Sequence, residues 1–425
     1  MVKQGYKQTE IGVIPEQWTV STIGAIADVK TGPFGSALHA DDYVQDGTPI
    51  ITVEHLGETG LTRQNLPKVS EEDRRRLSAY SMQDGDIVFS RVGSVDRNAY
   101  VTAAENGWLF SGRILRIRTK SKELSTQYLG YYFKSEDTKE RIRGVAVGQT
   151  MASLNTKLMN AFKVILPTVE EQKNIAALLS DMDTLVSTLE KQISKKKAIK
   201  QGAMQELLTG KRRLPGSSGE WRTEIIPNVL QKQEGIKIGP FGSQLRKEYL
   251  LEDGPYRVYG QENVYAQDFS IGNRYLNREK YRQLQSCEIH SGDFLISTMG
   301  TVGKCAIVPS SIQPGIMDSH LIRLRINEQK LMPEYLLHLF SEDLGYLKGQ
   351  TSKLSVGGIM DGLSTKIVNA LNVFYPEDLS EQKAIADILS EMDMEIAALE
   401  EKLAKYRQVK QGMMQQLLTG KIRLV

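Results

Sequence analysis

The sequence predicts an α/β (α+β) fold: two mixed α/β domains separated by two long antiparallel coiled-coil helices, arranged as a pseudo-two-fold internal repeat. Three observations support this fold. The 425 residues exceed the size of one ordinary domain. Several segments recur at a nearly constant offset. Two stretches carry the heptad pattern of paired helices. We therefore expect a first domain at 1–168, a helix at 169–210, a second domain at 211–377 and a second helix at 378–425.

The internal repeat divides into conserved ends and diverged bodies. Residues 171–214 and 381–424 align without a gap, and 24 of these 44 positions are identical. The bodies match less closely, at an offset of 207 residues: TGPFGSAL (31–38) with IGPFGSQL (238–245), and DGDIVFSRVGSV (84–95) with SGDFLISTMGTV (291–302). Similar helices and dissimilar bodies indicate a shared task for the helices and different targets for the bodies.

The two long helices are predicted from apolar residues spaced alternately four and three apart, which is an a/d seam. Pro167 and Pro376 precede them, and Gly210 and Gly420 follow where a left-handed cap favours glycine. We favour pairing within one chain and keep a coiled coil between two chains as the alternative. The expected pairing residues are Ile175, Leu179, Met182, Val186, Leu189, Ile385, Leu389, Met392, Ile396 and Leu399.

Some helix positions break the pattern. Lys196 and Lys200 interrupt the seam, so we expect imperfect pairing there. Gly202 and Gly412 lie in helix interiors, where glycine costs about 1 kcal/mol relative to alanine. Either a close helix crossing or a kink would explain them.

Each body is expected to contain many short strands. Leu115 and Ile117 alternate with Arg116 and Arg118, which predicts a strand with one buried and one basic face. In the second copy the corresponding basic residues are Arg323 and Arg325. These arginines are candidates for phosphate contact, and a merely solvated sheet face is the alternative.

Loops supply the other candidate contacts to nucleic acid. The GPFGS turn, present in both copies, either places its Phe34 or Phe241 in the core or lies near DNA, where its serine can donate to phosphates or bases. Arginine beside a loop glycine suits groove or phosphate contact; solvated loop charges are the alternative. The loop candidates are Phe34, Ser36, Arg91, Ser94, Arg97, Ser243, Thr298 and Lys304.

Trp18 in PEQW echoes Trp221 in GEWR. The repeat therefore predicts that the N-terminal stretch packs near the C-terminal end of the chain.

The sequence offers no sign of catalysis, cofactor or metal. GTVGKC at 300–305 has the wrong spacing for a phosphate-binding loop, and no dinucleotide fingerprint or adjacent prolines of an amino-methyltransferase occur. Glu-Gln-Lys at 171–173 and 381–383 resembles half of a nuclease site, but we interpret it as a helix start. Two cysteines and five scattered histidines give no metal-ligand spacing.

The remaining bulk properties concern location and partners. No apolar run approaches the ~20 residues that span a bilayer, and MVKQGYKQTE lacks a signal core, so we expect a cytoplasmic protein without membrane contact. A net charge of +3 is modest for binding DNA alone. It indicates local positive charge or a partner that supplies more.

Several motifs together resemble those of type I restriction-modification specificity subunits, and the resemblance covers essentially the whole chain. The motifs are the opening GYKQTEIGVIPEQW, the repeated GPFGS, the GQT triplets at 148–150 and 349–351, the helix start LPTVEEQKNIAALLSDMD and the ending QELLTGK. The resemblance implies two target-recognition domains, each recognising one half of an asymmetric bipartite site in double-stranded DNA. It also implies that the helices set the gap between the half-sites and dock two methyltransferase subunits, and that restriction/translocase subunits join the assembly. Methylation, ATP hydrolysis and cleavage would then belong to partners.

Two other functions remain open from the sequence. One is a stand-alone DNA-binding regulator with two modules, which would bind DNA tightly without a methyltransferase. The other is a coiled-coil scaffold without a nucleic-acid role, which would form homodimers and retain no DNA.

Overall fold

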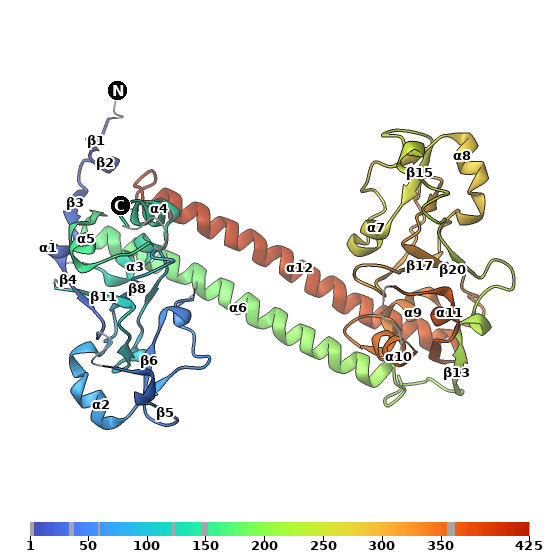
Figure 1. Cartoon of the computed structure of the whole chain (residues 1–425), viewed down its shortest axis with the longest axis horizontal. Coiled ribbons are helices and arrows are strands. Elements are labelled where there is room, and N and C mark those ends of the chain that lie inside the picture. Colours follow the sequence, from blue (N-terminus) through green and yellow to red (C-terminus); the bar gives the residue numbers. More distant parts are fainter. Residues whose placement is uncertain are drawn as a thin grey trace. The chain divides into compact units, whose positions relative to one another are not determined.

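A computed structural model describes residues 4–33, 38–57, 60–120, 124–146, 152–354 and 362–424 (Figure 1). The chain divides into two compact units, residues 1–190 with 402–425, and residues 191–401. Each unit holds one α/β domain together with parts of both long helices, α6 (Val169–Leu207) and α12 (Leu379–Leu417). The mixed α/β class predicted from the sequence is therefore confirmed.

The first unit is built around an antiparallel sheet of order β4-β11-β8-β9, beside a four-stranded sheet of order β10-β6-β7-β5. Two strand pairs, β1-β2 and β12-β3, complete it. The strands are β1 (Tyr6–Thr9), β2 (Gly12–Pro15), β3 (Thr19–Thr22), β4 (Ala27–Thr31), β5 (Tyr43–Val44), β6 (Thr48–Ile51), β7 (Lys68–Val69), β8 (Ile87–Ser90), β9 (Asn98–Tyr100), β10 (Leu109–Phe110), β11 (Ile114–Thr119) and β12 (Lys163–Leu166). The shorter helices are α1 (Ile23–Ile26), α2 (Glu71–Arg76), α3 (Thr126–Lys134), α4 (Glu136–Val145) and α5 (Thr156–Ala161).

The second unit repeats the central sheet as β14-β20-β17-β18 and adds a three-stranded sheet, β16-β15-β19, and the pair β13-β21. The strands are β13 (Trp221–Ile225), β14 (Ile236–Ile238), β15 (Tyr256–Tyr259), β16 (Tyr275–Leu276), β17 (Phe294–Ser297), β18 (Cys305–Ile307), β19 (Gly315–Met317), β20 (Leu321–Leu324) and β21 (Asn372–Pro376). The helices are α7 (Gln261–Ala266), α8 (Arg278–Gln283), α9 (Pro333–Leu339), α10 (Tyr346–Leu354) and α11 (Thr365–Asn369).

The central sheet is covered on both faces, which differs from the basic face expected from alternation. On β11, Leu115 and Ile117 join the main core of the first unit, whereas Ile114 joins a second core with Phe110 of β10. Arg116 lies on the same face of β11 as Ile114 and is buried, with its guanidinium 6.0 Å from the centroid of the Phe110 ring. The prediction of a basic sheet face is therefore wrong at Arg116, because a second layer covers it.

The long helices pair antiparallel inside each unit. In the first unit, Ile175 and Leu179 near the start of α6 share a core with Leu417 at the end of α12. In the second unit, Ile385 and Leu389 near the start of α12 share a core with Leu207 at the end of α6. Intrachain pairing through the predicted seam is thus confirmed at both ends. Of the other seam residues, Val186, Leu189 and Ile396 are buried and Met182, Met392 and Leu399 are half-buried.

The lysines that interrupt the seam make ion pairs across it. Lys196 Nζ lies 2.6 Å from Glu395 Oε1, and Lys200 Nζ lies 2.5 Å from Asp393 Oδ1. The interruption therefore replaces apolar packing with charge pairing. α6 and α12 are continuous through Gly202 and Gly412, and a Cβ at either glycine would meet nothing within 4 Å. A close crossing does not explain these glycines.

The ends of the helices are fixed by contacts that recur in both units. Glu171 is buried, accepts a hydrogen bond from Trp18 Nε1 at 2.8 Å and pairs with Arg423 at 2.8 Å. In the second unit Glu381 pairs with Arg213 in the corresponding place. The expected packing of the N-terminal stretch near the C-terminal end is confirmed, and Figure 1 shows both terminal labels at this unit. Within the described residues, no helix combines the length and apolarity needed to cross a membrane.

Candidate nucleic-acid interface

Three loops of the first domain meet at one end of its central sheet. β4 and β8 both run antiparallel to β11, so their final residues lie beside the first residues of β11. The residues after β4, the residues after β8 and the turn before β11 therefore form one loop cluster. It includes Gly32–Pro33, Arg91–Arg97 and Ser111–Arg113.

Backbone hydrogen bonds hold this cluster in place. Arg91 N donates to Arg113 O at 2.8 Å, and Leu154 N donates to Arg91 O at 2.8 Å. Gly32 N donates to Ile114 O at 3.0 Å. A Cβ on Gly32 would lie only 2.0 Å from Ser111 O, so the first glycine of the GPFGS motif is required for close backbone approach.

The second domain repeats the same frame at an offset of 207 residues, except that Leu363 corresponds to Leu154 at an offset of 209. Thr298 N donates to His320 O at 2.8 Å, and Leu363 N donates to Thr298 O at 2.8 Å. Gly239 N donates to Leu321 O at 3.0 Å, and a Cβ there would lie 1.7 Å from the backbone oxygen of Asp318. The two domains thus carry one backbone scaffold with different side chains.

The side chains projecting from the first cluster are basic and polar. Arg113 is exposed and has no side-chain hydrogen bond or ion pair with the described residues. Ser94 is also exposed. Arg91 is half-buried and donates from Nη1 to Gly112 O at 3.4 Å, and Arg97 donates from Nε to Leu56 O at 3.1 Å. This end of the domain can present guanidinium groups to a nucleic acid.

The second cluster is more apolar. Phe241 is 69 % exposed as a whole residue, which excludes the alternative that placed it in the core. Met299 and His320 are also exposed, at 42 % for the whole residue and 47 % for the side chain, and Ser243 is exposed on the same turn as Phe241. Phe34 and Ser36 of the first GPFGS motif lie outside the described residues, as does the first GQT triplet.

Three predicted contacts are too buried to face DNA. Arg323 and Thr298 are 1 % and 3 % exposed, and Arg116 is 4 % exposed. Burial lowers the pKa of both arginines, and Asp28 lies 2.7 Å from Arg116. Arg116 and Arg323 lie within β11 and β20, where layers on both faces of the sheet cover them, and Thr298 is buried in the loop that follows β17.

Three further candidates are held in ion pairs. Arg118 donates from Nε and Nη2 to the two carboxylate oxygens of Asp86, each at 2.7 Å. Its counterpart Arg325 lies 3.3 Å from Asp293, whose pKa is raised by burial. Both pairs lie at the end of the sheet away from the loop cluster. Lys304 lies at the same end as the cluster and pairs with Glu342 at 2.6 Å.

Sequence analysis missed Arg113, His320 and Met299. The signal was present in the repeat, because positions 113 and 320 correspond and directly precede matching strands. The sequence did not show the second layer that covers this face of the sheet and buries Arg116 and Arg323, while Arg113 and His320, directly before the strands, stay exposed.

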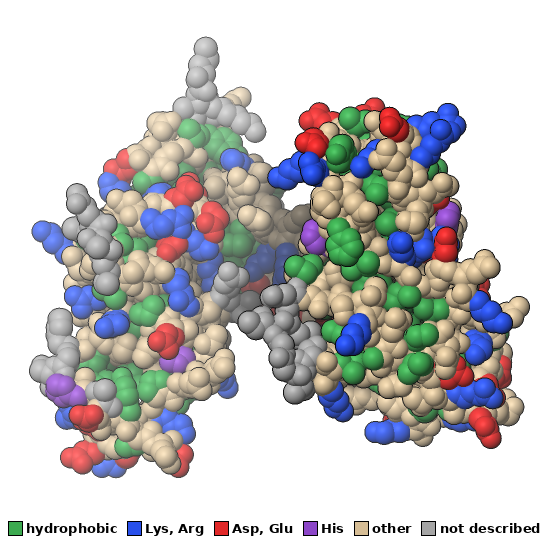
Figure 2. Space-filling view, turned by 45° about the vertical axis from the view of Figure 1, so that its right-hand side comes forward, with side chains coloured by type: hydrophobic (Ala, Val, Ile, Leu, Met, Phe, Trp, Pro, Cys, Tyr) green, Lys and Arg blue, Asp and Glu red, His purple; other side chains and the backbone are tan. Residues whose placement is uncertain are grey.

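Charge is mixed over the visible surface. Figure 2 shows basic and acidic side chains interspersed on the visible face of each unit, with apolar side chains gathered on part of the second. Any attraction to phosphate is therefore local, in agreement with the net charge of +3.

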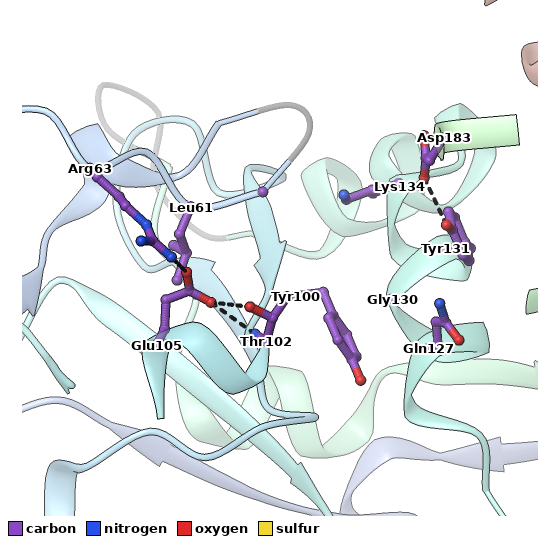
Figure 3. A pocket seen from close by; sticks show the side chains of 11 residues that line it. Leu61, Arg63, Tyr100, Thr102, Glu105, Gln127, Gly130, Tyr131, Lys134 and Asp183 are labelled. Atoms are coloured by element: carbon purple, nitrogen blue, oxygen red, sulfur yellow. Dashed lines mark hydrogen bonds and ion pairs between the residues drawn. The ribbon is translucent and has the colours of Figure 1, made fainter. Parts of the chain in front are cut away.

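A cavity of about 300 Å³ lies elsewhere in the first unit (Figure 3). Three of its charged side chains are already partnered: Arg63 pairs with Glu105 at 2.8 Å, and Asp183 accepts a hydrogen bond from Tyr131 at 2.7 Å. Burial lowers the pKa of Lys134 at its rim. Across the described ranges, no three His, Cys, Asp or Glu residues are grouped so as to hold a metal ion. We assign this cavity no ligand.

The fold and its duplicated loop cluster define an internally repeated binding protein with one candidate interface in each domain. A sequence profile described as the type I restriction modification DNA specificity domain matches residues 15–200 and 242–408. The chain therefore belongs to the family of type I restriction-modification specificity subunits. Members of this family are non-catalytic, and catalysis resides in partner subunits.

Individual relatives agree with this assignment. The chain is 27 % identical over 432 residues to a Methanocaldococcus jannaschii protein assigned as the type I restriction enzyme MjaX specificity subunit, covering 99 % of this chain and 97 % of that protein. It is 25 % identical over 437 residues to the MjaVIII specificity subunit of the same organism, with the same coverages. The type I S subunit from M. genitalium matches with a TM-score of 0.60 and 17 % identity over 94 % of this chain and 96 % of that one, which shows a shared fold.

Proposed function

We propose that this subunit recognises a bipartite, asymmetric site in double-stranded DNA. Each domain would contact one half-site through the loop cluster at the end of its central sheet. The observation that carries the proposal is the repeated backbone frame with different exposed side chains, Arg113 in one domain and His320 in the other. One scaffold with two sets of side chains suits two half-sites of different sequence.

The helix pair would set the gap between the half-sites. Both domains must face the same side of the duplex, so their contacts should fall about one helical turn, 34–36 Å, or a multiple of it apart. Paired helices of 39 residues, locked at each end by an ion pair, meet this demand better than a flexible linker.

The partners follow from the family. We propose that the subunit assembles with two methyltransferase subunits and with restriction/translocase subunits, and that it acts in the cytoplasm. The modest net charge supports a role for partners, because a chain of charge +3 neutralises few phosphates by itself. Adenine methylation, ATP hydrolysis and DNA cleavage are then performed by those partners.

The test is to purify the chain with its methyltransferase partner and map methylated adenines in DNA exposed to the complex. We expect co-purification and one methylated motif made of two different half-sites and a fixed gap. Tight specific binding by the chain alone would instead support a stand-alone regulator. Homodimers that retain no DNA would support a scaffold.

A further inference from the structure

Position 113 is one of the places where the side chains of the duplicated interface differ in chemistry. Arg113 and His320 occupy corresponding places, and each gives its carbonyl oxygen to the same backbone hydrogen bond, from Arg91 N and from Thr298 N. Since the backbone is the same, the side chain at this place determines what each domain offers to a ligand. The first domain offers a guanidinium and the second an imidazole.

The backbone beneath Arg113 is tightly held. Ile114 N donates to Ser111 O at 2.9 Å, closing the turn that carries Arg113. The Gly112 carbonyl accepts the Arg91 guanidinium at 3.4 Å, and a Cβ on Gly112 would lie 2.2 Å from Pro33 O. A side chain on such a turn is aimed by a fixed support, which is a requirement for base recognition.

The Arg113 guanidinium also lacks the internal partners that other arginines of this domain have. Arg63, Arg118 and Arg143 are each paired with a carboxylate, at 2.8, 2.7 and 2.5 Å. Arg113 is exposed and has no such partner within the described residues. It can therefore bind a ligand without first breaking an ion pair.

An unpaired guanidinium on a rigid turn, such as that of Arg113, is well suited to contact guanine. Two parallel N–H groups of arginine match the O6 and N7 acceptors of guanine in the major groove, and this bidentate contact distinguishes guanine from the other bases. The second domain has no arginine at either matching place, because Thr298 and His320 stand there. Its exposed Phe241 and Met299 favour apolar contact instead.

We propose that Arg113 is a specificity-determining residue that contacts a guanine in the half-site of the first domain. The inference rests on the proposed function and goes beyond it, since it assigns one base to one side chain. His320 at the corresponding place gives the second domain no such preference for guanine in its half-site.

The test uses the assembled complex of this chain with its methyltransferase. Binding selections from DNA randomised in both half-sites are compared for the wild-type chain, Arg113→Ala, Arg113→Lys and the control Lys120→Ala. Lys120 follows the other end of β11 and is exposed, so the control removes one positive charge away from the loop cluster.

Arg113→Ala should lose the preference for guanine at one position of one half-site and keep the other half-site unchanged. Affinity for the wild-type site should fall roughly 5- to 150-fold, which corresponds to about 1–3 kcal/mol. Arg113→Lys should keep non-specific binding but lose most of the guanine preference, because an ammonium cannot make the planar two-point contact. Lys120→Ala should select the wild-type motif.

Three results would overturn the inference. The first is an unchanged motif in Arg113→Ala. The second is uniform weakening on all DNA that Arg113→Lys restores, which would indicate a phosphate contact. The third is failure of Arg113→Ala to assemble, which would indicate a structural role for the side chain. A wild-type complex that selects no bipartite motif would instead refute the proposed function.

Discussion

At the scale of residues, a shift of three positions in the sequence decides whether an arginine is exposed or buried. Arg113 precedes β11 and is exposed, whereas Arg116 lies within β11, is 4 % exposed and packs near Phe110. The two side chains have the same chemistry, so their surroundings decide whether they contribute to stability or remain available for a ligand.

The first prediction compares these two arginines by denaturation. Arg116→Ala should destabilise the protein by at least about 2 kcal/mol, because it removes buried packing and leaves a cavity beside Phe110. Arg113→Ala should change the free energy of unfolding by no more than about 0.5 kcal/mol, as is usual for an exposed side chain. Urea unfolding followed by circular dichroism measures both. Equal losses in the two variants would show that exposure does not separate their roles.

His338 gives a prediction about pH. Burial lowers its pKa below the ordinary value of 6.5, while Asp393 raises it and Lys200 lowers it further. Its Nε2 lies 3.0 Å from Ser390 Oγ, and Asp343 is the other carboxylate near Lys200. Because the folded state disfavours the charged imidazole, the unfolded chain takes up a proton first as the pH falls through about 6.5. The contribution to stability is therefore present above that pH and is lost below it.

The measurement is thermal unfolding of the wild type and His338→Gln between pH 7.5 and 5.5. The wild type should lose more stability over this window than His338→Gln. His39→Gln, at an exposed position, is the control and should follow the wild type. If all three curves fall in parallel, His338 is not the group that titrates.

The limits of sequence analysis are clearest at this scale. Alternation on β11 correctly placed Leu115 and Ile117 in a core. It could not show that a second layer covers the opposite face, because that layer comes from β10, which pairs with the distant strand β6. Burial of Arg116, and the consequent shift of the candidate interface to Arg113, depend on that non-local packing.

At the scale of elements, the most strongly repeated sequence is explained by contacts that each helix end makes. Glu171 and Glu381 begin the helices, as expected, but they are also buried and paired with Arg423 and Arg213. The adjacent Gln172 accepts from Ser125 N at 2.9 Å and so supports the start of α3. Heptad spacing predicted the helices and their pairing. Heptad spacing could not predict these polar contacts at the helix starts, because the residues that Glu171, Glu381 and Gln172 contact lie far away in the sequence.

A glycine inside α6 and a glycine after its end should respond in opposite ways to substitution by alanine. Gly202 lies in the helix interior with open space around it, so Gly202→Ala should stabilise the protein by about 1 kcal/mol. Gly210 has a φ of +68° after the helix, so Gly210→Ala should destabilise it by about 1 kcal/mol. Urea denaturation of both variants checks the signs. The matched pair Gly412→Ala and Gly420→Ala should repeat the result in α12, and a destabilised Gly202→Ala would indicate that the helix needs glycine there.

At the scale of the whole molecule, the two copies of the repeat have similar helix ends and different loop side chains. The helix ends are alike because each forms the same kind of ion pair, at Glu171–Arg423 and Glu381–Arg213. The loop side chains differ between the domains, as the proposal of two different half-sites requires. The seam also changes character along its length. It is apolar at Ile175 and Ile385, where each helix joins a domain core, and ionic at Lys196 and Lys200. Lys196 and Lys200 belong to neither apolar core, although Lys200 also lies 3.6 Å from Asp343 of the second domain. An insertion at this ionic part therefore leaves the apolar packing around Ile175 and Ile385 in place.

The last prediction therefore lengthens the helices there. Four residues inserted after Ala198 of α6, together with four after Ile396 of α12, extend both helices by about 6 Å at 1.5 Å per residue. Since base pairs rise by about 3.4 Å, the gap in the recognised site should grow by one or two base pairs while both half-sites stay the same. Mapping of methylated adenines by the assembled complex measures the gap. As a control, a pair of insertions at the exposed turn near Ser217, which lies outside the helices, should leave the gap unchanged. A lengthened complex that methylates the original site would show that something other than the helix pair sets the spacing.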